Sequence, residues 1–349
     1  MRKYAINGRF VVRNLTGQER FARETFAELD KIIKPGWLEI VVPQYAEENK
    51  IPQYKNIKIV KWGHVKSHLW EQIDFFWYLI LHGRTGINPC TTCPLLKPDI
   101  NTLHDINQNV NPQFFTSRYG KLSTVWHTLM IYASFWFGKK VLTVSRFSKS
   151  EMVRVLKVNP DKIAVLGNGW QHVNRITPDD SIFDRYEQLK KGEYYFAASS
   201  LTPQKNFIWV INAAKKNPNA VFAIAGKKEK LTELLTDGVP GNLLFLGYVT
   251  DEEMKSLMQN CKAFIHPALY EGFGIPPIEA MANGAPLIIA KASCLPEIFR
   301  NSVHYIDPYN SDVNIDALLK ESVEASEKVL NEYSWEKNAK ELLEILKKI

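Results

Sequence analysis

Short runs of β-branched and aromatic residues alternate with longer helix-like segments along the whole chain, and this alternation constrains the fold most strongly. Strands that alternate with helices in this way are typical of parallel sheets covered by helices on both faces. In the first half, strands are predicted near Lys3–Ile6, Leu38–Val42, Ile57–Val60, Ile100–Leu103 and Val141–Val144, and helices near Gly17–Ile32, Ser67–Leu81 and Phe147–Leu156. The sequence therefore predicts an α/β chain.

A second series of the same kind follows the apolar run Ile163–Leu166. Its strands are predicted near Tyr194–Ala197, Val221–Ala225, Leu243–Leu246, Ala263–His266, Leu287–Ala290 and Val303–Tyr305. The polar stretch Gln171–Asp184 contains a proline and lacks a core-facing period, so it is the predicted connector. A length of 349 residues also favours two domains. In doubly wound sheets, ligands bind beyond the carboxyl ends of the strands, so the loops after the strands matter most.

Composition excludes several classes of protein. The chain is 45% hydrophobic and 23% charged, as ordinary globular enzymes are. Its net charge of +7 suits a diphosphate, an anionic lipid or a nucleic acid, but no basic run interleaved with aromatic residues indicates a nucleic-acid-binding module. Cys90 and Cys93 have the spacing of half a zinc site without a second such pair, so no metal is expected. Few cysteines and no secretory leader pattern favour a cytoplasmic protein.

The longest apolar stretch, Val125–Gly138, is shorter than the roughly 18 to 20 residues that a membrane-spanning helix needs. Aromatic and basic residues occur together around it, namely Trp126, Tyr132, Phe135, Trp136 and Phe137 with Arg118, Lys121, Lys139 and Lys140. Two interpretations fit this mixture. It is either a peripheral contact with an anionic membrane or a core helix with solvated flanks.

The segment from His266 to Pro296 carries the clearest binding signal. It is predicted to be a strand end, a loop with Gly272 and Gly274, and a short helix that begins near Pro277. A glycine-bearing loop at a helix start offers backbone amides and the positive end of the helix dipole to a ligand. Such a place suits an anion like a sugar diphosphate.

Within this segment Glu271 and Glu279 have the spacing of the E-x7-E signature, and the chain resembles the retaining family 4 (group 1 type) glycosyltransferases with the GT-B fold. The resemblance implies that Glu271 accepts hydrogen bonds from hydroxyls of the donor sugar. It implies that Glu279 accepts hydrogen bonds from the hydroxyls of the nucleotide ribose. The loop Gly272-Phe273-Gly274-Ile275 would bind the donor as well. Without the family context, Glu279 is also explained as an acidic residue near a helix N-terminus.

Other segments extend the resemblance. Ser199–Asn206 resembles the family's phosphate-binding loop, which implies that Lys205 neutralises the donor diphosphate with Ser200 and Asn206 beside it. Position 200 is serine where many members carry arginine, which puts a second cation on the diphosphate in doubt. Gly247-Tyr248-Val249 resembles the segment that contacts the nucleotide base.

Two positions in the first half of the chain also match the family's motifs. His104, at a predicted strand end, resembles the family's cleft histidine, and the resemblance implies a contact with the donor sugar. The alternative is an ordinary surface or core histidine. Gly17, at a predicted helix start, would place its amide near the diphosphate, or it is a plain turn glycine. Trp70-Glu71-Gln72 and Ser145–Ser148 match subgroup patterns that are expected to be mainly structural.

The resemblance implies two facing Rossmann-like, doubly wound domains. Residues 1–172 would form an acceptor-side domain, residues 173–332 a nucleotide-sugar-binding domain, and residues 333–349, with Trp335–Ala339, a helix that returns to the first domain.

The implied activity is retaining transfer of a hexose from a nucleoside-diphosphate sugar to a saccharide or lipid-linked acceptor, in polysaccharide biosynthesis. Neither a cofactor nor a metal is expected, since Lys205 and helix termini supply positive charge. Catalysis would rest on His104, Glu271 and Lys205. Two alternatives stay open: a GT-B sugar-nucleotide epimerase, and a non-catalytic protein that binds sugar nucleotides.

Overall fold

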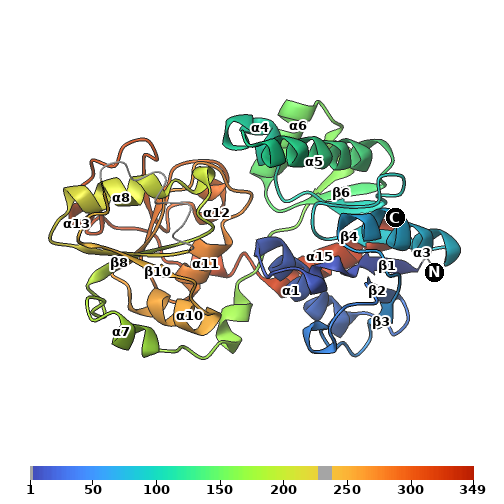
Figure 1. Ribbon diagram of the computed structural model, residues 1–349, viewed down its shortest axis with the longest axis horizontal. Coiled ribbons are helices and arrows are strands. Elements are labelled where there is room, and N and C mark those ends of the chain that lie inside the picture. The colour runs from blue at the N-terminus through green and yellow to red at the C-terminus, as the bar shows by residue number, and fades with distance from the viewer. Residues whose placement is uncertain (1–2, 227–237) are drawn as a thin grey trace. The chain divides into compact units, whose positions relative to one another are not determined.

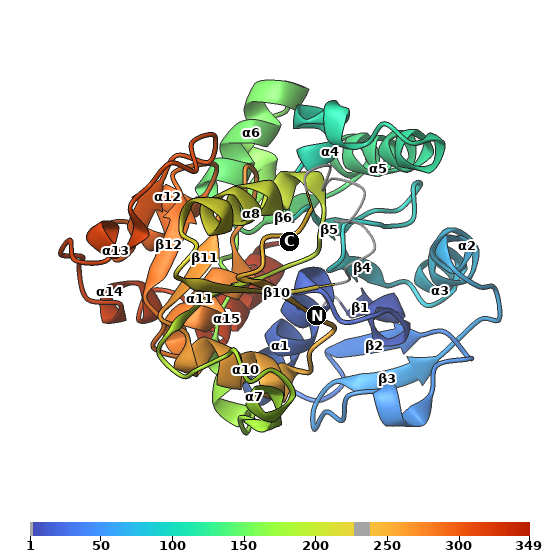
Figure 2. The same ribbon diagram turned by 60° about the vertical axis from the view of Figure 1, so that its left-hand side comes forward.

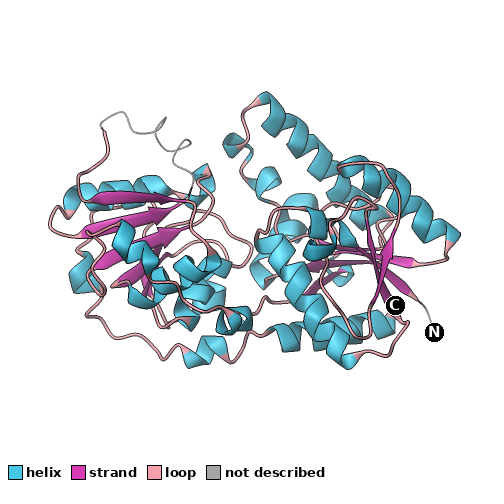
Figure 3. Ribbon diagram, turned by 60° about the horizontal axis from the view of Figure 1, so that its bottom comes forward, coloured by secondary structure: helices cyan, strands magenta, loops and turns pink. Residues whose placement is uncertain are grey.

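The chain forms two compact units in a computed structural model that describes residues 3–226 and 238–349. Unit 1 comprises Met1–Gly169 and Ser334–Ile349, and unit 2 comprises Trp170–Tyr333 (Figure 1). The sequence placed the corresponding divisions after residues 172 and 332. Each unit contains one parallel sheet with helices packed on it (Figure 3).

Unit 1 has a seven-stranded sheet in the order β3-β2-β1-β4-β5-β6-β7. Its strands are β1 Tyr4–Asn7, β2 Leu38–Val42, β3 Lys58–Lys61, β4 Thr85–Asn88, β5 Ile100–Thr102, β6 Lys140–Thr143 and β7 Ile163–Val165. All neighbouring strands are parallel. The strand order reverses between β1 and β4, which makes the carboxyl ends of these two strands the topological switch point of unit 1.

Helices cover both faces of this sheet. Those of unit 1 are α1 Gly17–Ile32, α2 His68–Trp70, α3 Phe76–Leu81, α4 Asn107–Val110, α5 Arg118–Trp136, α6 Arg146–Leu156 and α15 Trp335–Lys348. A π-helical turn, Glu71–Phe75, joins α2 to α3. Residues of α1 and α15 share one buried cluster with the sheet, whereas α2, α3, α5 and α6 pack on strand residues of the opposite face.

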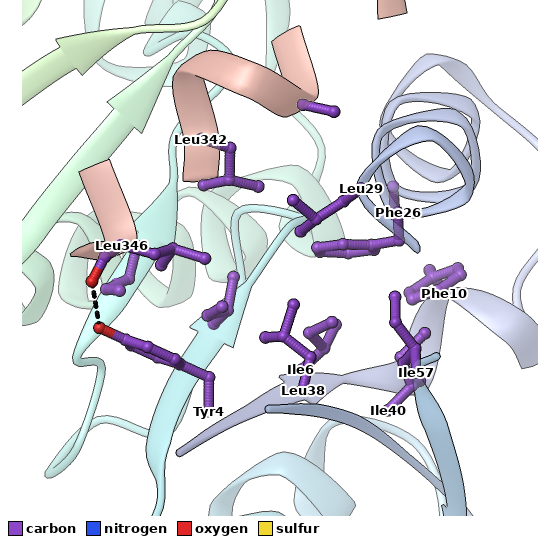
Figure 4. Close-up of a cluster of buried hydrophobic side chains, with 14 of the residues drawn as sticks. Tyr4, Ile6, Phe10, Phe26, Leu29, Leu38, Ile40, Ile57, Leu342 and Leu346 are labelled. Atoms are coloured by element: carbon purple, nitrogen blue, oxygen red, sulfur yellow. Dashed lines mark hydrogen bonds between the residues drawn. The ribbon is translucent and has the colours of Figure 1, made fainter. Parts of the chain in front are cut away.

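The C-terminal helix α15 belongs to the core of unit 1. It lies beside α1 (Figures 1 and 2), and its residues Leu342 and Leu346 are buried with Phe26 and Leu29 of α1 (Figure 4). The Tyr4 hydroxyl donates a hydrogen bond to the carbonyl oxygen of Leu346 at 2.5 Å. The prediction that a C-terminal helix returns to the first domain is confirmed.

Unit 2 has a six-stranded parallel sheet in the order β10-β9-β8-β11-β12-β13. Its strands are β8 Tyr194–Ala198, β9 Val221–Ala225, β10 Leu243–Gly247, β11 Ala263–His266, β12 Leu287–Ala290 and β13 His304–Ile306. Its helices include α7 Ser181–Arg185, α8 Phe207–Lys216, α10 Asp251–Asn260, α11 Ile275–Ala282, α12 Leu295–Phe299, α13 Ile315–Leu318 and α14 Glu327–Leu330. Here the order reverses between β8 and β11.

The sequence patterns missed β4, whose residues Thr-Gly-Ile-Asn do not resemble a buried strand. The strand is nevertheless buried, because its polar groups are paired: the Gly86 amide donates to Asp99 Oδ2 at 2.9 Å and Asn88 Nδ2 donates to the Pro98 carbonyl at 2.8 Å. Within residues 3–226 and 238–349, no helix is long and apolar enough to cross a membrane.

Candidate functional site

The loops that follow β8 and β11 lie at the switch point of unit 2 and are tied together by hydrogen bonds. The Leu269 amide donates to the Gln204 carbonyl at 2.8 Å. Asn206 Nδ2 donates to the carbonyls of Pro267 at 3.1 Å and Pro308 at 2.8 Å. Asn206, predicted to bind the donor, thus holds the loop after β8 against the loops after β11 and β13. Its left-handed backbone, with φ of 55°, starts α8 immediately after Lys205.

Lys205 and Glu271, which are 66 residues apart in sequence, form an ion pair at this point. Lys205 Nζ lies 2.5 Å from Glu271 Oε1, and His266 Nε2 lies 2.7 Å from the same oxygen. An ionised carboxylate only accepts hydrogen bonds, so His266 donates through its Nε2–H. All three side chains are largely removed from solvent, and Glu271 is 9% exposed.

The electrostatic surroundings of Glu271 keep it ionised. Burial raises the pKa of its carboxyl, but Lys205 and His266 outweigh that effect and lower the pKa to about 2. Both neighbours bind Oε1. The second oxygen, Oε2, has no hydrogen-bond donor among the described residues and is not sealed from solvent. One carboxylate oxygen of Glu271 is therefore held in place by its neighbours, and the other is available to a ligand.

The loop after Glu271 leads into α11 through Gly274, whose φ of 95° is the left-handed region that favours glycine. A Cβ there would also lie 3.0 Å from Leu295 Cδ2. In the described part of the chain, the backbone amides of Phe273, Gly274 and Ile275 have no hydrogen-bond acceptor. Free amides beside the positive end of an α-helix form a place for an anion.

Glu279, the second carboxylate of the E-x7-E signature, lies on α11 and accepts a hydrogen bond from His172. The His172 Nε2 to Glu279 Oε1 distance is 2.7 Å, and His172 is only 2% exposed. The sequence did not indicate this pair. A single histidine in a polar connector gives no pattern, and only the fold brings it next to a residue 107 positions away.

The other residues predicted to bind the donor surround the same sheet edge. Ser200 is exposed after β8, and its hydroxyl lies 3.5 Å from that of Thr202. Gly247 ends β10 with φ of 68°; Tyr248 is 80% exposed and Val249 is buried. All three loops, after β8, β10 and β11, leave the carboxyl ends of their strands, where a ligand of a doubly wound unit is expected.

In unit 1, His104 follows β5 and is 8% exposed. Its Nε2 lies 2.8 Å from the Pro89 carbonyl oxygen, and Phe21 packs edge-on against the ring. Burial lowers the pKa of His104 to about 4. A neutral ring that donates through Nε2 leaves Nδ1 as an acceptor, which suits a sugar hydroxyl. Gly17 begins α1, next to Thr16, whose amide donates to Glu19 Oε2 at 3.2 Å.

A buried polar network at the switch point of unit 1 was missed as a site by the sequence analysis. Glu71, in the π-helical turn, accepts from Arg9 Nη1 at 2.8 Å, from Asn7 Nδ2 at 3.0 Å and from Thr92 Oγ1 at 2.8 Å. Asn7 Nδ2 also donates to Asn88 Oδ1 at 3.1 Å. Burial raises the pKa of Glu71, but His68 first, and then Arg9, Asn7 and Thr92, outweigh burial and lower the pKa. The sequence predicted a mainly structural role for Trp70-Glu71-Gln72, but nothing in its spacing indicated that Glu71 meets Arg9 and Thr92.

Cys90 and Cys93 are both buried free thiols whose pKa burial raises. Cys93 Sγ lies 3.8 Å from Ser134 Oγ and 4.0 Å from Met130 Sδ. Within the described residues, no group of three or more histidine, cysteine, aspartate or glutamate side chains is arranged to hold a metal ion.

Comparison with known proteins agrees with this geometry. Residues 179–341, which include most of unit 2, match the family described as glycosyl transferases, group 1. The resemblance to the group 1 glycosyltransferases that the sequence predicted is thus confirmed. It is 29% identical over 228 residues to the O-antigen chain mannosyltransferase RfbU of Salmonella typhimurium, covering 63% of this chain and 60% of that protein. It is 27% identical over 266 residues to O-antigen chain mannosyltransferase B of Escherichia coli, covering 71% and 66%.

The chain thus spans less than two thirds of either relative. Among solved structures, that of Anabaena HepE in complex with UDP-glucose superposes with a TM-score of 0.74 at 16% identity, covering 100% of both chains. Two parallel sheets of seven and six strands in this arrangement are the GT-B fold, so the predicted fold class is confirmed.

Proposed function

We propose that this group 1 glycosyltransferase transfers a hexose from a nucleoside-diphosphate sugar to a saccharide or lipid-linked acceptor, with retention of anomeric configuration. One observation carries the proposal. Glu271 is fixed through Oε1 by Lys205 and His266, while its Oε2 faces no donor, beside the free amides that precede α11. This arrangement offers an acceptor for sugar hydroxyls next to a place for an anion.

Lys205 has two roles in this proposal, one without donor and one with donor. Without donor it neutralises Glu271 at 2.5 Å. With donor, the same ammonium group would also pair with the diphosphate. Negative charge on the diphosphate grows as the bond to the sugar breaks, so a fixed cation stabilises the transition state more than the bound substrate. Lys205 and the amides would therefore promote departure of the nucleoside diphosphate.

The remaining roles follow from the geometry of each residue. Glu271 Oε2 would accept from a donor-sugar hydroxyl, and the contact of His104 with the donor sugar stays a prediction from the family resemblance. Glu279, held by His172 at 2.7 Å, would accept from the ribose. As the bond between the anomeric carbon and the diphosphate breaks, the acceptor hydroxyl would attack on the face that the diphosphate leaves, through an oxocarbenium-like state, and give its proton to the departing diphosphate oxygen, so that the configuration is retained. Neither a metal nor another cofactor is required, because the lysine and the loop amides supply the positive charge.

The two O-antigen chain mannosyltransferases support mannose among the hexoses to be tested and polysaccharide biosynthesis as the process. GDP-mannose, UDP-hexoses and dTDP-sugars are the donors to be compared. We propose further that the enzyme works in the cytoplasm, where a lipid-linked acceptor is presented at a membrane surface.

A panel of these nucleotide sugars tests the proposal. The true donor should raise the unfolding temperature, since a ligand at 100 times its dissociation constant stabilises a protein by roughly 2.7 kcal/mol. It should also release its nucleoside diphosphate when acceptor is added. Conversion to an epimeric sugar nucleotide would identify an epimerase instead, and binding without release would identify a non-catalytic binder. Either result would refute the proposal.

A further inference from the structure

Unit 1 exposes an unusual amount of apolar surface on two helical segments. More than half of the exposed large apolar side chains in the described part of the chain belong to them. They are Leu69, Ile73, Trp77, Ile80 and Leu81 on the α2–α3 segment, and Leu122, Val125, Leu129, Trp136 and Phe137 on or next to α5. We call these ten residues the apolar helix surface. A large contiguous apolar patch on a folded protein marks a binding surface or an aggregation hazard.

The α2–α3 segment is apolar on two sides. Trp70, Phe75 and Leu79 are fully buried against the sheet. Leu69, Ile73, Trp77 and Leu81 recur every four residues and form a separate stripe, with exposures between 44% and 66%. A helix that only covered a sheet would carry polar residues along this stripe.

On α5 the exposed apolar residues differ from those expected from the sequence. Phe135, expected from the sequence to contribute, is buried at 6%, and Trp126 and Tyr132 are only partly exposed. Leu122, Val125 and Leu129, separated by three and four residues, are exposed instead, together with Trp136 and Phe137. One side of α5 is therefore core and the other is exposed apolar surface, and the membrane contact stays a prediction.

The two segments are joined into one surface. They cover the same face of the sheet (Figure 2). The rings of His68 and Trp126 lie 6.3 Å apart. Between them runs the loop of Cys93, whose carbonyl accepts from Gln72 Nε2 at 2.8 Å and whose Sγ lies 3.8 Å from Ser134 Oγ on α5. Leu96 of this loop is 75% exposed.

The α5 part of this surface is surrounded by charge of one sign, whereas Asp74 lies on the α2–α3 segment. Residues 106–150 include no aspartate or glutamate but contain Arg118, Lys121, Lys139, Lys140, Arg146 and Lys149. Lys139 pairs with Asp99 at 3.3 Å. Arg118 and Lys121 are exposed at the start of α5 and have no partner within the described residues, and the same holds for Lys66 just before α2. These three cations border the exposed leucines and the stripe.

We propose that the apolar helix surface docks the protein on an anionic lipid bilayer. Trp77, Trp136 and the neighbouring aliphatic side chains would enter the interfacial region, while Lys66, Arg118 and Lys121 pair with lipid phosphates. A second copy of the chain suits the surface less well, because residues 106–150 of that copy offer these cations no carboxylate. The docking extends the proposed function, since it would bring a lipid-linked acceptor within reach, but it does not depend on the identity of the donor.

Vesicle cosedimentation tests the proposal with the full chain. Vesicles of phosphatidylcholine with about one third phosphatidylglycerol should bind the protein, whereas pure phosphatidylcholine should bind it far less. Arg118→Glu with Lys121→Glu should weaken binding by about thirty-fold or more, because two attractive side chains are lost and two repulsive ones introduced. Trp77→Gln with Leu81→Gln should weaken binding to a similar degree, and this loss should persist at high salt.

Matched controls come from unit 2 and are not part of this surface. Lys215→Glu with Lys216→Glu makes the same charge change on α8, and Tyr309→Gln removes a side chain that is 85% exposed in unit 2. Both should leave vesicle binding within about two-fold of wild type. All variants should keep the unfolding temperature of wild type, and GDP or UDP should still stabilise them. Because nucleotide binding is measured separately from vesicle binding, a failure of this proposal can be distinguished from a failure of the proposed function.

Two outcomes would overturn the proposal. One is equal binding of the surface variants and the controls. The other is a wild-type dimer in sedimentation velocity that Trp77→Gln with Leu81→Gln dissociates, because the occupant would then be a second copy.

Discussion

At the scale of single residues, Glu271 illustrates how one carboxylate can be both rigid and available. Lys205 and His266 bind one oxygen, so the group cannot rotate freely, and the other oxygen stays open to a ligand. A buried carboxylate without such partners would become protonated. The partners therefore preserve its charge as well as its orientation.

Lys205→Ala tests the leaving-group role. If Lys205 is the main cation on the diphosphate, its removal should lower turnover by about a hundred-fold to a thousand-fold, since preorganised contacts to developing charge are worth about 2.7–4 kcal/mol. Ser200→Ala, in the same loop, should cost far less. Nucleoside diphosphate release measures both, with Glu271→Ala alongside. Near-normal turnover in Lys205→Ala would place the phosphate cation elsewhere.

The pKa of Glu271 predicts a dependence of stability on pH. Its value in the folded protein, about 2, lies below the ordinary 4.5. The carboxylate therefore stabilises unit 2 fully above pH 4.5, and this contribution, about 3 kcal/mol, is lost as the pH falls towards 2. Denaturant unfolding at pH 6 and pH 3 should show that Glu271→Gln loses less stability on acidification than wild type. Equal losses would show that Glu271 is not held ionised.

The sequence predicted residues of this site where spacing carries information, and missed them where it does not. Glu271 and Glu279 are eight residues apart on one loop and helix, so their joint presence is visible in the chain. His266 and His172 are single histidines, and only the folded structure brings each of them next to its glutamate. The Glu71 network is similar, because its members come from β1, the π-helical turn and the segment after β4.

At the scale of elements, a glycine with positive φ lies at each end of α11. Gly274 starts it with φ of 95°, and Gly284 follows it with φ of 84°. The helix has only eight residues, so its geometry depends on these ends and on the buried Ile278 and Met281. Glycine and proline indicated this helix in the sequence, although it begins at Ile275 rather than near Pro277. In contrast, β4 was missed because its burial depends on hydrogen bonds.

The two glycines form a matched pair of mutations. Gly284→Ala should cost about 1 kcal/mol, since its φ is positive but no atom lies within 4 Å of the new Cβ. Gly274→Ala should cost more, because Leu295 Cδ2 would lie at 3.0 Å, and it should also weaken donor binding by shifting the free amides. Unfolding and nucleotide-sugar titration measure both. If the two variants bound the donor equally well, the start of α11 would not be part of the donor site.

At the scale of the whole molecule, the last helix completes the first unit. Ala339, Leu342 and Leu346 of α15 are buried in the cluster that also contains β1, β2 and α1. The polar connector and the final Trp335–Ala339 segment indicated a two-domain chain whose end returns to its beginning. Periodicity alone did not show which side chains meet, since packing partners more than 300 residues apart leave no local pattern.

Leu342→Ala should therefore destabilise unit 1 by about 2–5 kcal/mol, the usual cost of truncating a buried leucine. Stabilisation of unit 2 by nucleotide should persist. Lys340→Ala, on the exposed side of the same helix, should change stability by less than about 0.5 kcal/mol. Calorimetry with and without GDP or UDP distinguishes the two units. Loss of nucleotide binding in Leu342→Ala would show that unit 2 depends on this core.

The most direct test of the account is proton NMR of the reaction between an α-linked nucleotide sugar and its acceptor, run with wild type and Lys205→Ala. The account predicts that the first transferred sugar keeps the α configuration, seen in its anomeric proton coupling, and that the lysine variant forms it about a hundred-fold or more slowly. An inverted product, or equal rates in the two proteins, would contradict it.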